Sequence, residues 1–86
     1  MTLNLILRPE AEADVADAFT WYERQTLGLG SHFLLCVEAG LSQIRRYPEA
    51  SPIVYRKIRR VLLRRFPYCV FYIIEGERIV VLDAVV

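Results

Sequence analysis

The sequence lacks the cysteine pattern of a disulfide-stapled or zinc-binding protein. Its two cysteines, Cys36 and Cys69, lie far apart, and neither belongs to a CxxC pair. Small disulfide scaffolds carry more cysteines than this, and structural zinc sites need four closely spaced Cys or His ligands. We therefore expect two free, buried thiols and no metal site.

Long apolar runs and a leader segment are also missing. The longest apolar run, Phe66–Ile74, has nine residues and contains Pro67, whereas a membrane-spanning helix needs about 18. The segment Met1–Leu7 has no basic region and only a brief apolar stretch, so it does not have the form of a secretory signal. These absences predict a cytoplasmic protein without a membrane segment.

The chain is short and almost neutral, but it is rich in apolar residues. Its 86 residues, with a net charge of +1, are enough for one domain, which we expect to span residues 1–86. Hydrophobic residues make up 55% of the chain, above the roughly 45–50% of an average soluble domain. A chain of this size leaves part of its apolar surface uncovered, and we expect a partner protein to cover it.

The first half of the sequence predicts a strand followed by two helices. Residues 2–7 form a short apolar-rich strand, and Pro9 then suits the first turn of a helix. Apolar side chains recur at helical spacing over residues 9–25 and again over 32–46. Because glycines interrupt the pattern between these two segments, the helices should form an antiparallel hairpin.

Two details of the second helix follow from single residues. Ser31 stands where a side chain would cap the first turn. Gly40 lies in mid-helix, where glycine costs roughly 1 kcal/mol relative to alanine. We interpret Gly40 as the point at which the first helix approaches closely.

The second half, after a turn over residues 48–52, predicts three strands over 57–66, 68–74 and 78–86. A tight turn at residues 75–77 makes the last two strands an antiparallel hairpin. The strand 68–74 is apolar on both alternating sets, which places it centrally and covers it on both sides. The fold class is therefore α+β, in the order β-α-α-β-β-β, with the helical hairpin on one face of a mostly antiparallel sheet.

The strongest polar feature is a run of six basic residues within ten positions and without an acidic residue. One interpretation is a solvated strand edge, where basic side chains discourage unwanted pairing. The other is a binding surface for phosphates or for an acidic segment of a partner. The six residues are Arg56, Lys57, Arg59, Arg60, Arg64 and Arg65.

The remaining polar residues do not form a catalytic or metal-binding motif. The single histidine, His32, has only Ser31 beside it, and this serine is explained by helix capping. Four acidic residues of the first helix lack the His or Cys companions of a metal site and are expected to form a solvated face. They are Glu10, Glu12, Asp14 and Asp17. We expect no cofactor.

Trp21 falls beside the face of the first helix that carries Asp14 and Asp17. Two interpretations stay open for this side chain. It is either a half-buried lid on the core or an anchor of a protein interface.

Several segments together resemble the RelE/ParE toxin superfamily of type II toxin–antitoxin systems. The resemblance covers nearly the whole chain and is most specific at the Phe-Pro-Tyr segment with the strand that follows it. The segments are Arg8–Asp14, Trp21–Tyr22, Tyr47–Pro48, Arg64–Tyr68, Val70–Tyr72 and Ile79–Leu82. It implies the same fold order and a bacterial toxin that is neutralised by an antitoxin encoded beside it.

Within the superfamily, the sequence is more similar to the ParE-like branch. Cys69 stands where RelE-like enzymes tend to carry a catalytic arginine, and no His/Arg-containing tail follows Asp83–Val86. The resemblance therefore implies a protein without catalytic residues that inhibits DNA gyrase by protein–protein contact. It also implies a ParD-like antitoxin whose acidic residues meet the basic run.

Two alternatives to this function stay open. Lys57 and Arg59 fall where RelE-like enzymes carry basic residues, which is consistent with a ribosome-dependent mRNA endonuclease. The second alternative is a relic, that is, a family member that has lost its toxicity and only binds antitoxin. Direct binding to nucleic acid is expected only through the antitoxin complex.

Overall fold

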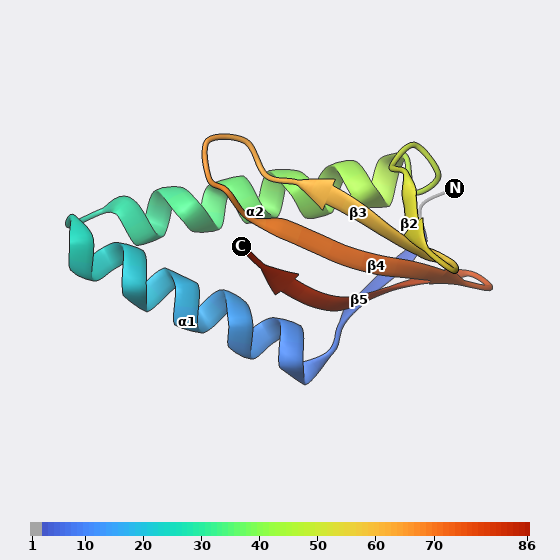
Figure 1. Ribbon diagram of the computed structural model, residues 1–86, viewed down its shortest axis with the longest axis horizontal. Helices are drawn as coiled ribbons and strands as arrows, with labels where there is room; N and C mark the ends of the chain where they lie inside the picture. Colours follow the sequence, from blue (N-terminus) through green and yellow to red (C-terminus); the bar gives the residue numbers. More distant parts are fainter. Residues whose placement is uncertain (1–2) are drawn as a thin grey trace.

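The computed structural model describes residues 3–86 as two helices packed against a five-stranded sheet (Figure 1). The sheet order is β1-β5-β4-β3-β2, in which β1 runs parallel to β5 and every other neighbouring pair is antiparallel. The elements are β1 Asn4–Leu7, α1 Pro9–Gln25, α2 Leu29–Arg46, β2 Ile53–Tyr55, β3 Ile58–Leu62, β4 Cys69–Glu75 and β5 Arg78–Val85. The predicted α+β class is confirmed, with one strand more than expected.

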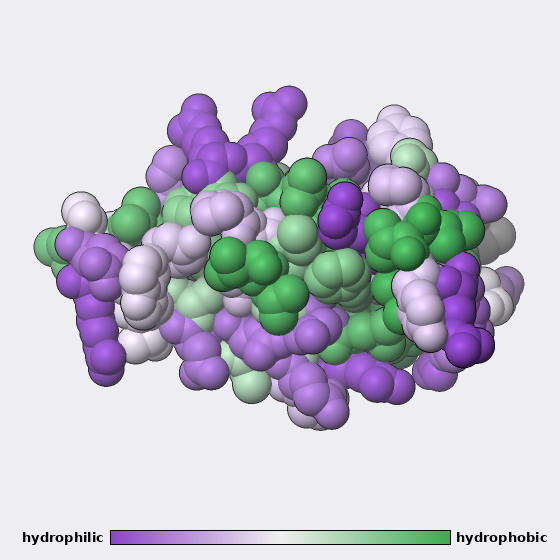
Figure 2. Space-filling model, in the orientation of Figure 1, coloured by the Kyte–Doolittle hydropathy of each residue, from purple (hydrophilic) through white to green (hydrophobic). Residues whose placement is uncertain are grey.

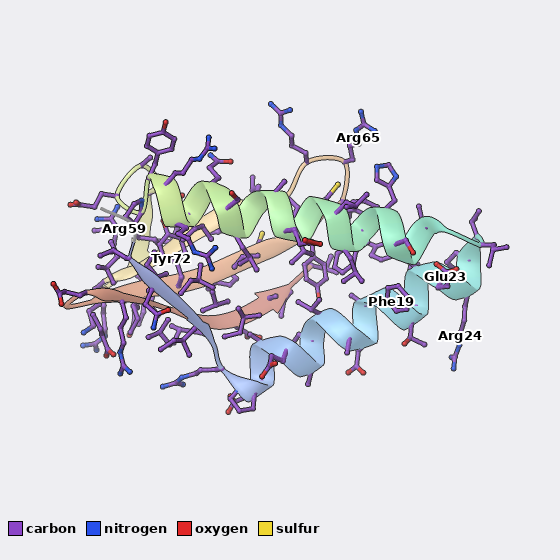
Figure 3. The ribbon with its side chains drawn as sticks, turned by 180° about the vertical axis from the view of Figure 1, so that it is seen from behind. Phe19, Glu23, Arg24, Arg59, Arg65 and Tyr72 are labelled. Carbon is purple, nitrogen blue, oxygen red and sulfur yellow. The ribbon has the colours of Figure 1, made fainter. Side chains whose placement is uncertain are left out.

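Both helices lie on the same side of the sheet, and the core fills the space between them. In Figure 1 the sheet lies in front of α2, and Figure 3 shows the helices from the opposite side. The innermost side chains come from α2, β4 and β5, and all are under 2% exposed. They are Phe33, Ile44, Val70, Tyr72, Ile79 and Val81. Burial of these apolar groups is the main favourable term for the fold.

The α1–α2 connection is tighter than the sequence predicted. Helix α1 has the expected bounds, but α2 begins at Leu29 rather than at residue 32, and Ser31 is not its cap. Gly28 precedes α2 in the left-handed conformation, with a φ of 89°. The Glu23 carboxylate accepts hydrogen bonds from the N–H groups of Gly28 (2.8 Å) and Gly30 (2.9 Å). An acidic side chain of the preceding helix thus caps α2, where free N–H groups and the helix dipole favour a negative charge.

The close approach of the two helices occurs at Gly30 and not at Gly40. A Cβ at Gly30 would lie 2.8 Å from the carbonyl oxygen of Phe19 on α1. Glu23 and Phe19 face this turn in Figure 3. Gly40 instead faces the sheet, because a Cβ there would lie 2.9 Å from Cδ2 of Leu63. The prediction that a glycine of α2 allows the close helix contact is correct, but this glycine is Gly30 and not Gly40.

The predicted single strand over residues 57–66 is wrong in its bounds. Residues 53–55 form the edge strand β2, a turn at Arg56 and Lys57 leads into β3, and β3 ends at Leu62. Residues 63–68 then form a loop closed by the N–H of Leu63 on the carbonyl of Tyr68 (2.9 Å). The loop allows Leu63 and Phe66 to be buried together, which an extended strand would place on opposite faces.

The other strands agree more closely with the prediction. Strand β4 is the middle strand of the sheet, and Gly76 turns it into β5 with a φ of 60°. The first strand is confirmed from Asn4 onward, while Thr2 lies outside the described residues. Strand β3, however, is an inner strand, so its basic residues do not mark the edge of the sheet.

The expectation that β4 is covered on both sides holds fully for the helix side and in part for the other side. Val70 and Tyr72 are buried under the helices, whereas on the opposite face Ile73 is buried and Cys69 and Phe71 are half-buried. Both cysteines are free, as expected, but neither is fully buried. Figure 2 views the molecule from this side and shows apolar residues at its surface. No described helix covers this face of the sheet.

The two glycines of α2 should respond differently to alanine. Gly30→Ala should lower the free energy of unfolding by about 1–3 kcal/mol, because the new methyl group meets the backbone of α1. Gly40→Ala should change it by less than about 1 kcal/mol, because the gain in helix propensity offsets a shift of the Leu63 side chain. Urea unfolding followed by circular dichroism measures both. An equal loss for the two variants would contradict the assignment of the helix contact.

Candidate functional site

Arg59 has a structural task. Its guanidinium group donates hydrogen bonds to the carbonyl oxygens of Glu49 (3.1 Å) and Ser51 (2.7 Å), in the loop between α2 and β2. The hydroxyl group of Tyr72 donates to the carbonyl of Pro48 in the same loop (2.7 Å). Figure 3 shows both side chains beneath the end of α2. Arg59 is therefore committed to holding this loop in place.

The other five basic residues lie at three separate places. Arg56 and Lys57 form the β2–β3 turn, where Arg56 has a φ of 53° and lies 5.2 Å from the ring centroid of Tyr55. Arg60 lies on β3 opposite Phe71. Arg64 and Arg65 follow β3 in the loop, and Arg65 points away from the protein (Figure 3). The sequence run is therefore not a continuous basic surface.

Arg64 and Arg65 border an open groove against α2, with a volume of about 420 Å³. Two leucines contribute apolar surface to it, since Leu35 is 65% and Leu62 is 64% exposed. We call this the α2 groove. It is lined by His32, Leu35, Cys36, Ala39, Gly40, Gln43, Leu62, Arg64 and Arg65. Its charge is positive, because Arg64 and Arg65 line it and no acidic residue does.

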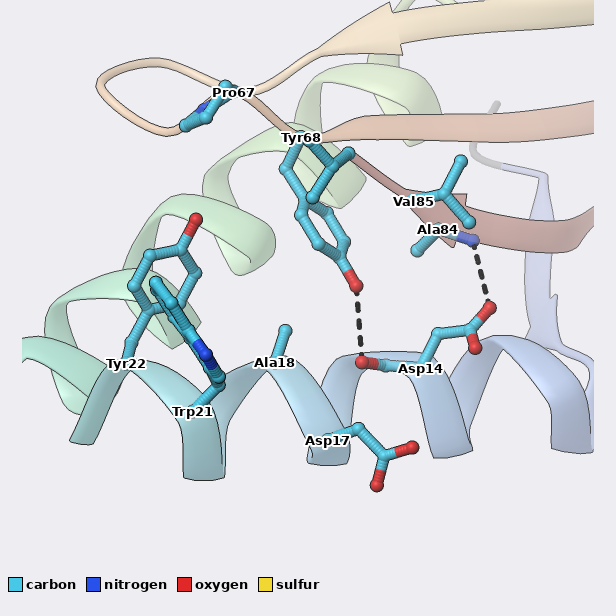
Figure 4. Close-up of a pocket in the computed structure, with 10 residues that line it drawn as sticks. Asp14, Asp17, Ala18, Trp21, Tyr22, Pro67, Tyr68, Ala84 and Val85 are labelled. Atoms are coloured by element: carbon cyan, nitrogen blue, oxygen red, sulfur yellow. Dashed lines mark hydrogen bonds between the residues drawn. The ribbon is translucent and has the colours of Figure 1, made fainter. Parts of the chain in front are cut away.

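A second and larger groove, of about 590 Å³, runs between α1 and the ends of β4 and β5 (Figure 4). Trp21 lines it and is 58% exposed, which does not match a lid over the core. We call this the α1 groove. It is lined by Asp14, Asp17, Ala18, Trp21, Tyr22, Pro67, Tyr68, Ala84, Val85 and Val86.

Asp14 ties the helical wall of the α1 groove to its sheet wall. Its backbone carbonyl accepts a hydrogen bond from the hydroxyl group of Tyr68 (3.1 Å), and its carboxylate accepts one from the N–H of Ala84 (3.5 Å). Burial and the nearby carboxylates raise the pKa of Tyr68 to about 12. The hydroxyl group therefore stays protonated and keeps donating at physiological pH.

Asp83 adds a third carboxylate behind this groove. A side-chain hydrogen bond with Asp14, followed by burial, raises the pKa of Asp83 above its ordinary value, although the N–H of Ala84 acts in the opposite direction. Within residues 3–86 the only ion pair joins Arg78 to Glu75 (3.1 Å). The carboxylates of the α1 groove therefore have no basic partner in the described part of the chain.

Comparison with known proteins decides the family. The family model for the ParE toxin of type II toxin–antitoxin systems, parDE, matches residues 5–85. The chain belongs to this ParE toxin family. The resemblance noted in the sequence is thereby confirmed, and the protein is a toxin of the type II class.

Structural comparison agrees with this family. A chain of the chromosomal ParDE TA system from P. aeruginosa superposes with a TM-score of 0.74 at 17% identity, over 98% of this chain and 95% of that chain. At this identity the likeness shows a shared fold. No curated protein sequence matches the chain.

In this ParE family member, the basic residues that are close together in the sequence lie apart in the structure, whereas Asp14 comes close to β5. Arg59 is not available as a binding residue, because its guanidinium group is bonded to a backbone carbonyl. His32 packs edge-on against Phe66, with ring centroids 5.7 Å apart. The acidic face of α1 is not wholly solvated, because Asp14 bonds to β5. The shared helix face of Asp14, Asp17 and Trp21 was the one sequence signal for the α1 groove.

The described residues contain neither a metal-binding cluster nor a membrane-spanning helix. Among residues 3–86, no cluster of three or more His, Cys, Asp or Glu side chains is placed to hold a metal ion. In the same range, neither helix has the length and apolar character needed to cross a membrane.

The Asp14–Asp83 contact predicts a specific pH dependence of stability. Because the pKa of Asp83 is raised in the folded state, folding favours its protonated form, and this contribution is lost as the pH rises from 3.8 through the folded-state pKa. Asp83→Asn should therefore be more stable than the parent protein at pH 7, and the difference should shrink as the pH falls toward 3.8. Urea unfolding at a series of pH values measures this.

Glu77→Gln is the matched control, because Glu77 is an exposed carboxylate in the β4–β5 turn. It should keep the pH profile of the parent protein. A profile of Asp83→Asn that runs parallel to the parent from pH 4 to pH 7 would show that the carboxyl pair does not influence stability.

Proposed function

We propose that this toxin acts in the cytoplasm by binding other proteins, with DNA gyrase as its target and a ParD-like antitoxin as its inhibitor. Membership of the ParE toxin family supports the toxin class. The observation that carries the binding mechanism is the pair of open, partly apolar grooves with charged borders, one beside each helix. Apolar surface with a charged rim is the usual composition of a protein interface.

The positions of the basic residues favour binding over RNA cleavage. Cleavage would require several groups to converge on one phosphate, where they move protons and stabilise developing charge. Lys57 precedes β3 and Arg64 follows it, so the five residues of the strand separate them by about 16 Å. Arg59 is bound to two backbone carbonyls. These positions do not support the mRNA endonuclease alternative.

The α2 groove is the best candidate for the antitoxin. Its exposed leucines, Leu35 and Leu62, offer apolar contacts, and Arg64 and Arg65 border them with positive charge. An amphipathic segment with apolar and acidic residues complements both features. The backbone of Arg65 supports a role for its side chain, because its φ of 69° is unfavourable for a non-glycine residue.

Purified protein tests the target directly. It should inhibit DNA supercoiling by gyrase in a concentration-dependent way, and its expression in bacteria without antitoxin should arrest growth with a DNA damage response and intact mRNA. A gyrase assay unaffected by excess folded protein would contradict the gyrase target. Arrest with cut mRNA that is abolished by Lys57→Ala would support the endonuclease, and normal growth with soluble protein would support the relic.

The antitoxin site has its own test with two matched double variants. Arg64→Gln with Arg65→Gln should weaken binding of a co-purified ParD-like antitoxin about three- to tenfold, because two charges at the interface rim are lost. Arg45→Gln with Arg46→Gln removes the same charge from the exposed end of α2 and should leave the affinity within about twofold. Titration by calorimetry measures both, and equal losses would exclude the α2 groove.

A further inference from the structure

The two grooves carry charges of opposite sign. Arginines border the α2 groove, whereas Asp14 and Asp17 line the α1 groove and no Lys or Arg lines it. The acidic segment proposed for the α2 groove would be repelled from the α1 groove. The α1 groove therefore needs an occupant of different chemistry.

The α1 groove has the shape of a trough for a polypeptide segment. Its helical wall consists of residues 14, 17, 18, 21 and 22, which share one face of α1 and extend over about 12 Å at 1.5 Å per residue. Tyr68, Ala84 and Val85 form the facing wall (Figure 4). The trough is open to solvent along the helix, so a chain can enter from the side.

The two ends of this trough differ in chemistry. Trp21, Tyr22 and Pro67 gather at one end, and Asp14 and Asp17 lie at the other (Figure 4). The aromatic end offers an exposed apolar surface, because Trp21 is 58% exposed and packs edge-on against Tyr22 at 5.2 Å. The acidic end offers carboxylates that have no ion-pair partner among residues 3–86.

The acidic side chains beside the α1 groove lie close to one another and repel each other in the unbound protein. The N–H of Ala84 donates to the carboxylates of both Asp14 (3.5 Å) and Asp83 (3.0 Å), which places the two acids side by side, and Glu10 and Asp17 on α1 add negative charge beside Asp83 and Tyr68. Tyr68, the titratable group that faces them from the residue before β4, stays neutral. A cation brought by another molecule would relieve this repulsion.

We propose that the α1 groove binds a segment of a partner protein that carries a large apolar side chain about 10 Å from a Lys or Arg. The apolar side chain packs on Trp21, and the cation pairs with Asp14 and Asp17. The spacing follows from the seven positions that separate Asp14 from Trp21 on α1, at 1.5 Å per position. In a partner helix it corresponds to two residues seven positions apart, which lie on the same face of that helix.

The charge of the α1 groove argues against nucleic acid as its occupant, and its residue composition argues against a metal ion. The carboxylates repel the phosphates of nucleic acid. A bound metal ion alone is not supported, because residues 3–86 contain no cluster of three metal ligands. The site is separate from the α2 groove, so it does not depend on the identity of the antitoxin.

Trp21 is the only tryptophan of the chain, so its fluorescence reports directly on the groove. The probes are three synthetic helical peptides of equal length: one with Leu and Lys seven positions apart, one with Glu in place of this Lys, and one with Ser in place of this Leu. The Leu/Lys peptide should bind saturably and shift the emission of Trp21 to shorter wavelength. The other two should bind about three- to tenfold more weakly.

Variants of the protein assign the charge effect to the groove. Asp14→Asn with Asp17→Asn should weaken binding of the Leu/Lys peptide about three- to tenfold, because asparagine keeps the acceptor for Ala84 but loses the charge. Glu38→Gln with Glu77→Gln removes the same charge from exposed positions outside the groove and should leave the affinity within about twofold. Thermal melts show that both variants are folded.

Three results would overturn the proposal. The first is equal affinity for the Lys and Glu peptides, and the second is an equal loss in the two double variants. The third is self-association of the protein that depends on Asp14 and Asp17, because a second copy would then be the occupant; sedimentation velocity at several concentrations measures this. An affinity for the Leu/Lys peptide that falls with added salt supports the ion pair.

Discussion

Burial of the inner face of the β4–β5 hairpin under the two helices is the interaction on which the rest of the structure depends. Val70, Tyr72, Ile79 and Val81 supply that face, and each is at most 1% exposed. Both helices lie on this side, where their apolar faces pack against these residues. Each helix also passes beyond the sheet, and a groove forms beside it.

Backbone groups, more than charges, hold the borders of these grooves. Tyr68 fixes the sheet wall of the α1 groove through the carbonyl of Asp14, and Arg59 and Tyr72 hold the loop that leads into β2. Charged side chains without an ion-pair partner among residues 3–86 line both grooves, with acids beside α1 and arginines after β3. A small toxin domain can in this way present two different surfaces.

Local backbone strain points in the same direction. Arg56 and Arg65 both have positive φ values, a conformation that suits glycine better than any other residue. Each stands in a loop that flanks β3, and each exposes its side chain to solvent. Arginine at such positions is consistent with a role of the side chain that offsets a modest loss of stability.

Local patterns in the sequence determined much of this fold. Helix α1, the middle position of β4 and the turn at Gly76 follow from Pro9, from apolar periodicity and from turn chemistry, which act between residues close in the chain. The family resemblance rested on short segments of the same kind, and it was correct for residues 5–85.

Tertiary structure alone decided the capping of α2 by Glu23, the contact of Gly30 with α1 and the loop after β3. It also separated the basic run into three places and placed Asp14 beside Ala84, 70 positions later in the chain. Periodicity shows which face of an element is apolar, but it does not show which distant backbone atom meets that face. The composition of the two grooves, and with it their opposite charge, depends on such distant contacts.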